Sequence, residues 1–381
     1  LMNKILRCGR INKKFIKISL SNKNQKLNNE LKVRDKNFEE RVTQLRPITK
    51  LIRENDIAKI ALELFESGRS VLIVRNTISK VYETFNDLLE IKPFLIHARL
   101  CVRDRKDILK RISKLLKRKN VCLVGTQVIE AGVNLDFDDI ITDAAPISSI
   151  VQRVGRVHRE IDERINRGEL EYEVYIVEYY KDQIYDNEIV TRTVKALKDH
   201  DLKINWKIPW DTELKGYKSI MNDVYSHIRF DLDGALRRVM VEIDQSLIIS
   251  YKDVKRLIEK ICSFVREDVL IPVVVPEIFE QELSHKNAYE AIINASVPLT
   301  KSYLERNKDI LDYKNGKLAL IVIDNSDVHK VWIEIDNINC SLEQKIAKKL
   351  KNKLGKVFNV IALTLKEGVY ERGFGLIKGD S

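Results

Sequence analysis

The sequence contains few cysteines and no long hydrophobic run, and each absence excludes a class of protein. Its five cysteines are scattered, odd in number and never spaced as CxxC, which argues against a disulfide framework and against a cysteine zinc site. The longest apolar candidate, Val269–Val275, is interrupted by Pro272 and is too short to cross a bilayer. The segment after Met2 alternates lysines with apolar residues, unlike a secretory leader. We therefore predict a cytoplasmic protein with reduced thiols and no membrane partner.

The net charge of +11 is concentrated in two segments. Residues 1–50 contain 14 Lys and Arg residues against four Asp and Glu residues. The segment from Arg99 to Lys119 contains ten basic residues against Asp104 and Asp107. Clustered basic charge attracts phosphate backbones without reading their sequence, so nucleic acid is a candidate partner. An ordinary solvated surface is the alternative for both segments.

Hydrophobic periodicity divides the chain into three parts. Residues 1–45 are polar and lysine-rich, and we interpret them as a linker or the remnant of a preceding lobe. In residues 46–182, short apolar runs alternate with amphipathic helical patterns, which predicts an α/β fold with a parallel sheet covered on both faces. The predicted strands lie at 71–74, 94–96, 121–124, 140–142 and 174–177. Residues 183–381 read as mostly helical to about 265 and then as mixed strands and helices, typical of an α+β accessory domain.

Polar residues follow four of these predicted strands at the point where each strand ends. They are Arg75-Asn76-Thr77, His97-Ala98-Arg99, Gly125-Thr126-Gln127 and Asp143. Because parallel sheets meet their ligands at the carboxyl ends of the strands, these residues are predicted to line one binding edge. A turn or a helix cap is the alternative for any one of them.

The most specific pattern is the octet Gln152-Arg153-Val154-Gly155-Arg156-Val157-His158-Arg159. Arg156 and Arg159 are three positions apart, so on a helix both side chains project from the same face. Adjacent guanidinium groups repel each other unless an anion lies between them, and their fork geometry suits phosphate. Gly155 permits a close approach to the backbone. The octet therefore predicts a phosphate site, with a salt-bridged surface helix as the alternative.

The octet resembles the QRxGRxxR motif, motif VI of superfamily 2 helicases, which belongs to their second RecA-like domain. Residues Thr126 to Asp136 resemble motif V, and Val71 to Thr77 resemble motif IV. This resemblance covers roughly residues 45–180 and implies a RecA-like fold there.

Shorter signatures resemble one family within that superfamily, the CRISPR-associated helicase-nuclease of type I interference. They are His97-Ala98-Arg99-Leu100 with Asp104-Arg105, the Thr-Gln-x-x-Glu opening of motif V, and the closing Tyr370-x-x-x-x-Gly375-Leu376. Asn134 stands where this family usually has Asp, which puts a ribose or metal-side contact there in doubt. Ala98 replaces the usual Ser and removes a hydroxyl that could touch a phosphate. The chain thus resembles the C-terminal half of that family, a second RecA-like domain followed by an accessory domain.

The resemblance implies roles for individual residues. Arg159 is expected to be an arginine finger for ATP bound on the first lobe, an effect worth about a thousandfold or more in related machines. Arg156 is expected to be a second phosphate contact. Further contacts to the nucleotide are expected from Gln152, Gly132, Asn134 and Asp136. Contacts to single-stranded DNA are expected from Asn76, Thr77, His97, Arg99, Thr126 and Gln127.

The sequence lacks the motifs that would complete a motor. A phosphate loop ends in Gly-Lys followed by Ser or Thr, but the only Gly-Lys pairs, at Gly316 and Gly355, are not followed by either. The only Asp-Glu pair, at Asp162, comes after the octet, whereas Walker B should precede it. We therefore expect ATP and Mg²⁺ to be bound mainly by a separate first lobe, and the chain alone to be inactive. The only His-Asp pair, at His200, shows no nuclease pattern, and no metal site is expected.

The leading hypothesis is the C-terminal lobe of an ATP-dependent single-stranded-DNA translocase or helicase in CRISPR interference. The expected partners are the first RecA-like lobe, single-stranded DNA, the CRISPR surveillance complex and a separate metal-dependent nuclease. Two alternatives remain. One is a non-catalytic nucleic-acid-binding adaptor or remnant, and the other is half of a general superfamily 2 DNA or RNA helicase.

Overall fold

The computed structural model describes residues 36–130, 134–178, 184–226, 270–324, 327–334 and 360–377. The chain divides into residues 1–39 and 40–381. Of the first unit, only the beginning of α2 (Lys36–Val42) is described. The predicted linker therefore lies largely outside the described residues. The sequence also predicts a strand at residues 15–20 and a helix capped by Ser341, and both lie outside the described residues as well.

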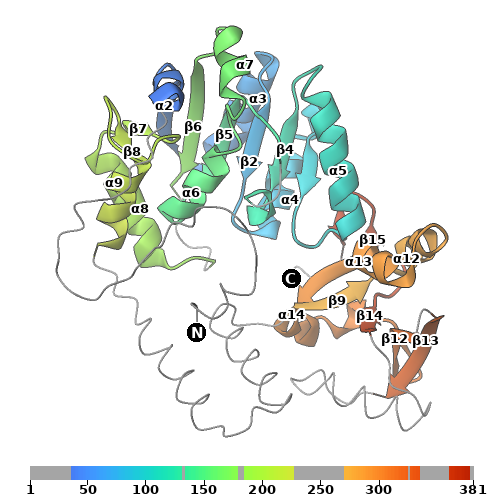
Figure 1. Ribbon diagram of the computed structural model, residues 1–381. Coiled ribbons are helices and arrows are strands. Elements are labelled where there is room, and N and C mark those ends of the chain that lie inside the picture. The colour runs from blue at the N-terminus through green and yellow to red at the C-terminus, as the bar shows by residue number, and fades with distance from the viewer. Residues whose placement is uncertain are drawn as a thin grey trace, which may run out of the picture. The chain divides into compact units, whose positions relative to one another are not determined.

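A six-stranded sheet, parallel throughout, forms the core of residues 46–177 (Figure 1). The strands lie in the order β1-β6-β5-β2-β4-β3. Their bounds are β1 (Arg46–Ile52), β2 (Val71–Val74), β3 (Phe94–Ile96), β4 (Cys122–Gly125), β5 (Asp139–Asp143) and β6 (Glu171–Val177). The α/β prediction and five of its strands are confirmed. The sequence reading missed β1, because this edge strand has charged residues among its partly buried ones.

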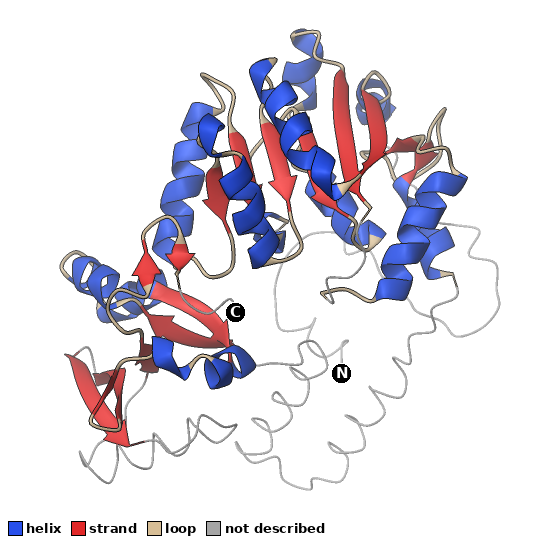
Figure 2. Cartoon of the chain, turned by 180° about the vertical axis from the view of Figure 1, so that it is seen from behind, coloured by secondary structure: helices blue, strands red, loops and turns tan. Residues whose placement is uncertain are grey.

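Helices cover both faces of this sheet, as seen from behind in Figure 2. The helices are α3 (Ile57–Glu66), α4 (Ile78–Asp87), α5 (Val102–Leu115), α6 (Ile147–Val154) and α7 (Ile161–Asn166). Alternate residues of a strand point to opposite faces. Val71 and Ile73 of β2 accordingly join the apolar cluster of α3 and α4, whereas Leu72 and Val74 join that of α5 and α6. This two-sided burial accounts for the continuous apolar run of β2.

The segment 184–226 adds α8 (Asn187–Asp199), β7 (Ile204–Asn205), β8 (Lys215–Gly216) and α9 (Tyr217–Tyr225). Its buried residues, including Leu197, Trp206 and Ile220, share the hydrophobic cluster on the α5–α6 side of the first sheet. Trp206 also donates a hydrogen bond from Nε1 to Thr49 Oγ1 of β1, at 3.0 Å. The domain boundary predicted at residue 183 therefore does not coincide with a break in the core.

A second six-stranded sheet lies between residues 270 and 364 and has its own core. Its strands are β9 (Leu270–Val274), β10 (Ser296–Thr300), β11 (Tyr313–Lys314), β12 (Lys317–Asp324), β13 (Asp327–Glu334) and β14 (Val360–Thr364). Among the described strands of this sheet, β14 and β9 pair in parallel and the other pairs are antiparallel. Its helices are α12 (Pro276–Leu283), α13 (Ala288–Ala295) and α14 (Lys301–Arg306), and a hairpin of β15 (Tyr370–Glu371) and β16 (Gly375–Leu376) follows. No helix in the described ranges is long and apolar enough to span a membrane.

Candidate nucleotide and nucleic-acid interface

The polar residues at the carboxyl ends of β2 and β5 form a buried network. The carboxylate of Asp143 accepts hydrogen bonds from Arg75 Nε at 2.9 Å and from the backbone N–H of Asn76 at 2.7 Å. The Asn76 side chain donates to the carbonyl of Ala144 at 2.9 Å. Burial raises the pKa of Asp143, and the neighbouring Arg75 opposes that rise. The parallel topology thus brings these strand ends together, but the polar side chains at these ends form hydrogen bonds within the protein.

Arg153 of α6 is the centre of this network, and the sequence reading assigned it no role. It is fully buried and donates to Glu130 Oε1, Thr142 Oγ1, Asn76 Oδ1 and Tyr185 OH at 2.8–3.1 Å. A fifth bond runs to the carbonyl of residue 143, at 3.2 Å. All five N–H donors of the guanidinium group are therefore used inside the protein. Arg153 ties α6 to the carboxyl edge of the sheet and is not available to a ligand.

Three of the side chains predicted to touch DNA are buried. Asn76 is 2% exposed, and both ends of its amide are bonded within the network. His97 is fully buried, with Nε2 2.9 Å from the carbonyl of Phe374 and Nδ1 accepting the N–H of Arg99. Thr126 is 2% exposed, and its hydroxyl has no hydrogen-bond partner among the described residues. The predicted direct DNA contacts of Asn76 and His97 are corrected, because their polar atoms face other parts of the chain.

The other three predicted DNA contacts are partly exposed. Thr77 caps α4, its hydroxyl accepting the N–H of Lys80 at 3.3 Å. Gln127 donates from Nε2 to the carbonyl of residue 76 at 3.1 Å. The guanidinium group of Arg99 lies over the ring of Tyr303, 4.4 Å from its centroid. Polar surface for a nucleic-acid backbone therefore remains near these strand ends.

The segment between β4 and β5 runs from the carboxyl ends of the parallel strands back to their amino ends. Since β4 and β5 are parallel, it returns from Thr126 at a carboxyl end to Asp136, just before β5. Gly132 lies outside the described residues, and Asn134 is exposed. Glu130 makes the connection: its carboxylate binds Arg153, and its carbonyl accepts a hydrogen bond from Arg156.

The second half of the octet is a loop, so the prediction that Arg156 and Arg159 share a helical face is wrong. The helix α6 ends at Val154. Val157 instead forms a parallel bridge with Phe137, and Phe137 N–H donates to the carbonyl of residue 156 at 3.0 Å. A backbone engaged in such a bridge cannot continue a helix. Gln152 is exposed on the last turn of α6, and a Cβ at Gly155 would meet only that turn, 3.1 Å from its carbonyl oxygen.

The loop nevertheless holds the two arginines close together. Arg156 donates to the carbonyl of Glu130, and the N–H of Arg159 donates to Asp136 Oδ1 at 2.7 Å. The side chain of Arg159 is exposed, whereas that of Arg156 is partly buried. Burial lowers the pKa of the Arg156 guanidinium, and repulsion from Arg159 lowers it further. An anion between the two side chains would relieve this repulsion.

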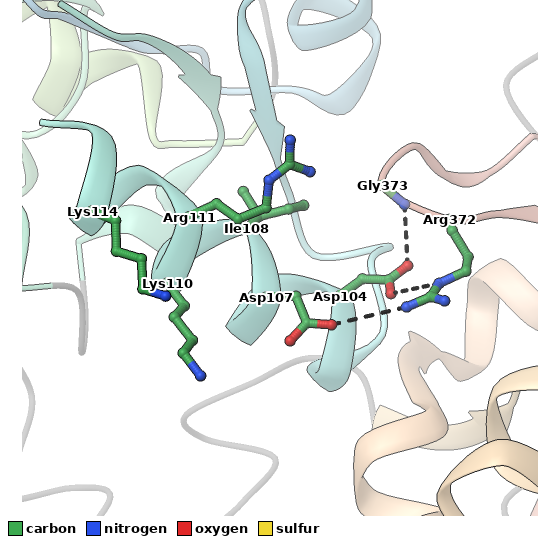
Figure 3. A pocket seen from close by; sticks show the side chains of 8 residues that line it. All are labelled: Asp104, Asp107, Ile108, Lys110, Arg111, Lys114, Arg372 and Gly373. Atoms are coloured by element: carbon green, nitrogen blue, oxygen red, sulfur yellow. Dashed lines mark hydrogen bonds and ion pairs between the residues drawn. The ribbon is translucent and has the colours of Figure 1, made fainter. Parts of the chain in front are cut away.

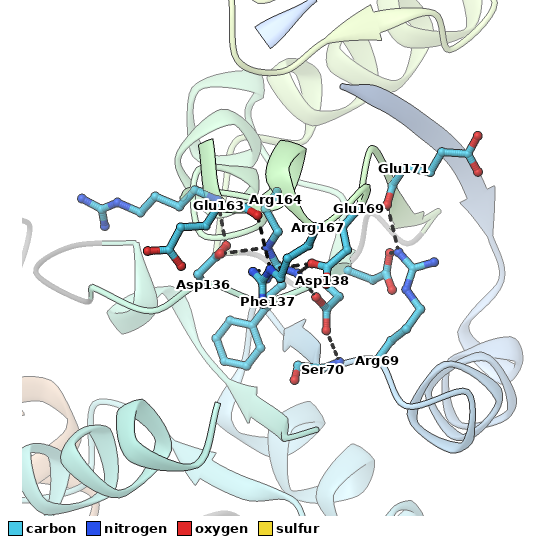
Figure 4. Close-up of polar contacts among 12 residues, drawn as sticks. Arg69, Ser70, Asp136, Phe137, Asp138, Glu163, Arg164, Arg167, Glu169 and Glu171 are labelled. Carbon is cyan, nitrogen blue, oxygen red and sulfur yellow. Dashed lines mark hydrogen bonds and ion pairs between the residues drawn. The ribbon is translucent and has the colours of Figure 1, made fainter. Parts of the chain in front are cut away.

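Asp136 joins the loop 155–159 to the cluster of charged side chains around Arg164 (Figure 4). Its Oδ2 accepts Arg164 Nε at 3.0 Å, so both carboxylate oxygens are engaged. Arg164 also binds the carboxylates of Asp138 and Glu169, the latter at 2.7 Å. Burial lowers the pKa of Arg164, but Asp138 and Asp136 outweigh it and raise the pKa. Asp136, predicted to contact the nucleotide, thus holds the backbone of Arg159 in place.

His158 completes the loop in a conformation that few side chains adopt. Its φ of 44° lies in the left-handed region, and its ring packs on Tyr172 with the centroids 5.0 Å apart. Burial, with the positive charges of Arg164 and Lys207, lowers the pKa of His158 to about 3. A non-glycine residue held in this region stores strain, which is often found at functional sites.

An open groove of about 550 Å³ runs along the exposed side of α5 (Figure 3). Lys110, Arg111 and Lys114 are exposed along its helical wall. Arg372 enters from the opposite side, within 3.5 Å of Asp104 and 3.9 Å of Asp107. The basic segment predicted from the sequence therefore forms a concave surface with an excess of positive charge.

The hairpin of β15 and β16 docks beside this groove. The hydroxyl of Tyr370 donates to Asp104 Oδ2 at 2.8 Å and accepts the N–H of Cys101 at 3.0 Å. The ring of Phe374 stacks on Tyr82, with the centroids 5.3 Å apart. Gly375 has a φ of 93°, and a Cβ there would lie 2.8 Å from His97 Cε1. The signatures around residues 97–105 and 370–376 are therefore parts of one contact.

In the ranges that the structure describes, no group of three or more His, Cys, Asp and Glu side chains is placed to hold a metal ion. Cys101 and Cys122 are buried free thiols, and burial raises the pKa of both, that of Cys122 to about 12.

Known proteins resemble the chain over the segment that carries this site. Residues 67–162 match the family model of the CRISPR-associated nuclease/helicase Cas3, C-terminal. A putative CRISPR-associated nuclease/helicase Cas3 from Methanocaldococcus jannaschii is 24% identical over 257 residues, 65% of this chain and 33% of that protein. The Cas3 of Methanothermobacter thermautotrophicus is 25% identical over 253 residues, 62% of this chain and 28% of that protein.

The crystal structure of T. fusca Cas3 with ADP superposes with a TM-score of 0.48 at 18% identity, over 71% of this chain and 38% of that one. The chain spans about a third of the length of the two archaeal relatives. The sequence matches and the family model name the same family. By its family model and its sequence matches, the chain is similar to the C-terminal helicase part of the CRISPR-associated nuclease/helicase Cas3 family.

Proposed function

We propose that the chain supplies the second ATPase lobe of a single-stranded-DNA translocase acting in CRISPR interference. The observation that carries this proposal is the loop 155–159, in which two arginines are held close together on a fixed backbone. A rigid pair of cations that repel each other in the absence of an anion is suited to the charge that develops during phosphoryl transfer.

In this proposal the first lobe binds ATP and Mg²⁺, and this chain closes over the phosphates. Arg159, whose side chain is exposed, acts as the arginine finger, and Arg156 provides a second contact. The exposed side chains of Gln152 and Asn134 would contact the nucleotide. Gly132, in the same segment, keeps the role that the family resemblance implies.

DNA contacts are assigned to residues that keep exposed surface. Thr77, Gln127 and Arg99 lie near the carboxyl ends of the strands and would hold the backbone of a single strand. The basic groove of α5 would extend this track through phosphate contacts. Asn76 and His97 act indirectly, because the carbonyl of residue 76 accepts a hydrogen bond from Gln127 and His97 Nδ1 accepts the N–H of Arg99. Thr126 acts through its backbone, whose N–H donates to the carbonyl of Ile96 at 3.0 Å.

The family also suggests partners. The names of the relatives combine nuclease and helicase activity in CRISPR systems. We extend this to a surveillance complex that presents the displaced DNA strand and to a separate metal-dependent nuclease that cuts it.

The test is ATP hydrolysis with single-stranded DNA by the full 381-residue chain, alone and mixed with the first lobe of a close relative. The proposal expects no turnover by the chain alone and DNA-stimulated turnover in the mixture. Arg159→Ala should reduce that turnover by about a thousandfold, the usual effect of losing an arginine finger. Arg167→Ala, a nearby exposed arginine outside the loop, serves as the matched control and should retain it.

Three outcomes would contradict the proposal. Turnover by the chain alone that depends on Arg159 would reveal a complete phosphate site within it. Association of the two lobes without any turnover would indicate a non-catalytic nucleic-acid-binding adaptor. A clear preference for RNA would indicate a general helicase instead.

A further inference from the structure

Lys207 carries a buried amine that none of the roles above uses. Its Nζ donates to the carbonyl of Val154 at 3.1 Å and also to the carbonyl of Val157. The same amine lies over the ring of Tyr172, 5.6 Å from its centroid. Lys207 therefore reaches from the segment after β7 to the end of α6.

These two carbonyls bracket the start of the arginine loop. Val154 is the last residue of α6, and Val157 lies just beyond Arg156. The final carbonyls of a helix have no partner within the helix, and a cation near them is favourable. A single side chain thus fixes both ends of the turn that contains Gly155 and Arg156.

The backbone around Lys207 is itself held firmly. The side chain of Asn205, 3% exposed, accepts the N–H groups of Lys207 at 2.9 Å and Ile208 at 3.2 Å. The adjacent Trp206 is 2% exposed and bonded to Thr49 of β1. The amine is consequently presented from a rigid support.

Burying the charged form of the Lys207 amine at this position costs electrostatic free energy. The pKa of Lys207 is lowered to about 7, chiefly by burial; Asp136 opposes this shift, and the positive charges of Arg159, Arg156 and Arg164 add to it. An apolar side chain would fill this space without that cost. A residue that breaks a local rule in this way, beside a strained loop, is expected at a functional site rather than at a purely structural one.

We infer that Lys207 is a positioning residue that holds Arg156 and Arg159 in the geometry needed for ATP hydrolysis. The inference rests on the proposed function, and it gives a role to a residue outside the matched segment 67–162. It connects the 184–226 segment directly to the ATPase centre.

The experiment replaces Lys207 with Met in the full chain and measures DNA-stimulated ATP turnover after mixing with the first lobe. Misplaced arginines should lower kcat by about tenfold to a hundredfold, while the KM for ATP stays within about twofold. Lys203→Met, an exposed lysine of the same segment, is the matched control and should be unchanged. If the Met variant does not fold, Lys207→Gln, whose amide still donates but carries no charge, is measured in the same way.

The decisive readout adds Lys207→Met to a variant in which Arg156 and Arg159 are both replaced by Ala. If Lys207 acts through the two arginines, the added substitution should not slow that variant further, because residues that act as a unit are not additive. Losses that multiply, or a Lys207→Met kcat within about twofold of the parent, would overturn the inference. A fully active Arg159→Ala would instead refute the proposed function, so the two failures can be told apart.

Discussion

Two arginines, Arg75 and Arg153, determine what the carboxyl edge of the first sheet can do. Both are 2% exposed or less, and each is bonded to carboxylates and side-chain oxygens from several elements. Removing one member of a buried ion pair leaves its partner charged and without compensation. The network therefore acts as a rigid support for the residues that remain on the surface.

Replacement of Arg153 by Met should lower the free energy of unfolding by about 3–5 kcal/mol, since Glu130 and four other acceptors lose their donor. Urea unfolding of the variant and the parent measures this difference. Arg118→Met, at an exposed position, is the control and should change stability by less than about 0.5 kcal/mol. A loss below about 1 kcal/mol for Arg153→Met would show that the network is not the support described here.

His158 should make the protein sensitive to acid. The pKa of His158 is lowered to about 3 in the folded state by burial, whereas the unfolded chain binds this proton near pH 6.5. The unfolded state therefore holds more protons between these values, and stability falls as the pH is lowered from about 6.5 to 3, by up to about 1.4 kcal/mol per pH unit. His158→Asn, which tolerates the left-handed backbone, should flatten the pH dependence in urea unfolding. The exposed His285→Asn should leave it unchanged.

At the scale of elements, the hairpin of β15 and β16 is held by one close backbone approach. Gly375 lies where any Cβ would meet His97 Cε1 at 2.8 Å and the carbonyl oxygen of Arg99 at 2.9 Å. The hydrogen bonds of Tyr370 and the stacking of Phe374 depend on that approach. The position of the hairpin therefore controls how firmly the loop 97–100 is held.

Gly375→Ala should release this loop. The expected result is faster amide hydrogen exchange across residues 97–101 and a lower melting temperature. Gly368→Ala is the matched control, because its φ of 76° carries a similar backbone penalty while its Cβ would meet nothing within 4 Å. Equal effects of the two substitutions on exchange at 97–101 would mean that the hairpin contact does not secure the loop.

The sequence predicted elements with local periodicity and failed where distant residues decide. The strands β2 to β6 could be predicted from their short apolar runs. Parallel topology also predicted that the polar residues after these strands gather at one edge of the sheet. The end of α6 was not visible, because the bridge that stops it joins Val157 to Phe137. Asn76 looked like an available amide at a strand end, since its partner Arg153 is 77 residues away. Lys207 gave no signal, because it lies outside every motif.

At the scale of the whole molecule, positive charge favours an anionic partner more than any single contact does. The chain carries a net charge of +11, and α5 places three exposed basic residues along one groove. Release of counterions from single-stranded nucleic acid makes such binding strongly dependent on salt. Affinity and its salt dependence thus report directly on the proposed track.

Lys110→Gln combined with Lys114→Gln should weaken binding to single-stranded DNA. If both lysines touch phosphates, the slope of log K against log salt should decrease in magnitude by about 1.4, at about 0.7 for each contact. Fluorescence anisotropy with a labelled oligonucleotide across a salt series measures the slope. The double variant Lys195→Gln with Lys203→Gln removes the same charge from exposed positions elsewhere and is the control. An equal decrease in both would mean that net charge alone attracts DNA.

The pairing of β1 with β6 also has a consequence for synthesis on the ribosome. The register joins Arg46 to Glu171, so β1 emerges 125 residues before β6, its partner among the described strands. At about 5–20 residues per second, this strand waits for roughly 6–25 s with its backbone unpaired. Pro47 and the charges of Arg46 and Lys50 are the features that discourage an unpaired strand from joining a neighbouring nascent chain. The charged residues that made β1 hard to predict from the sequence would thus discourage such pairing during synthesis.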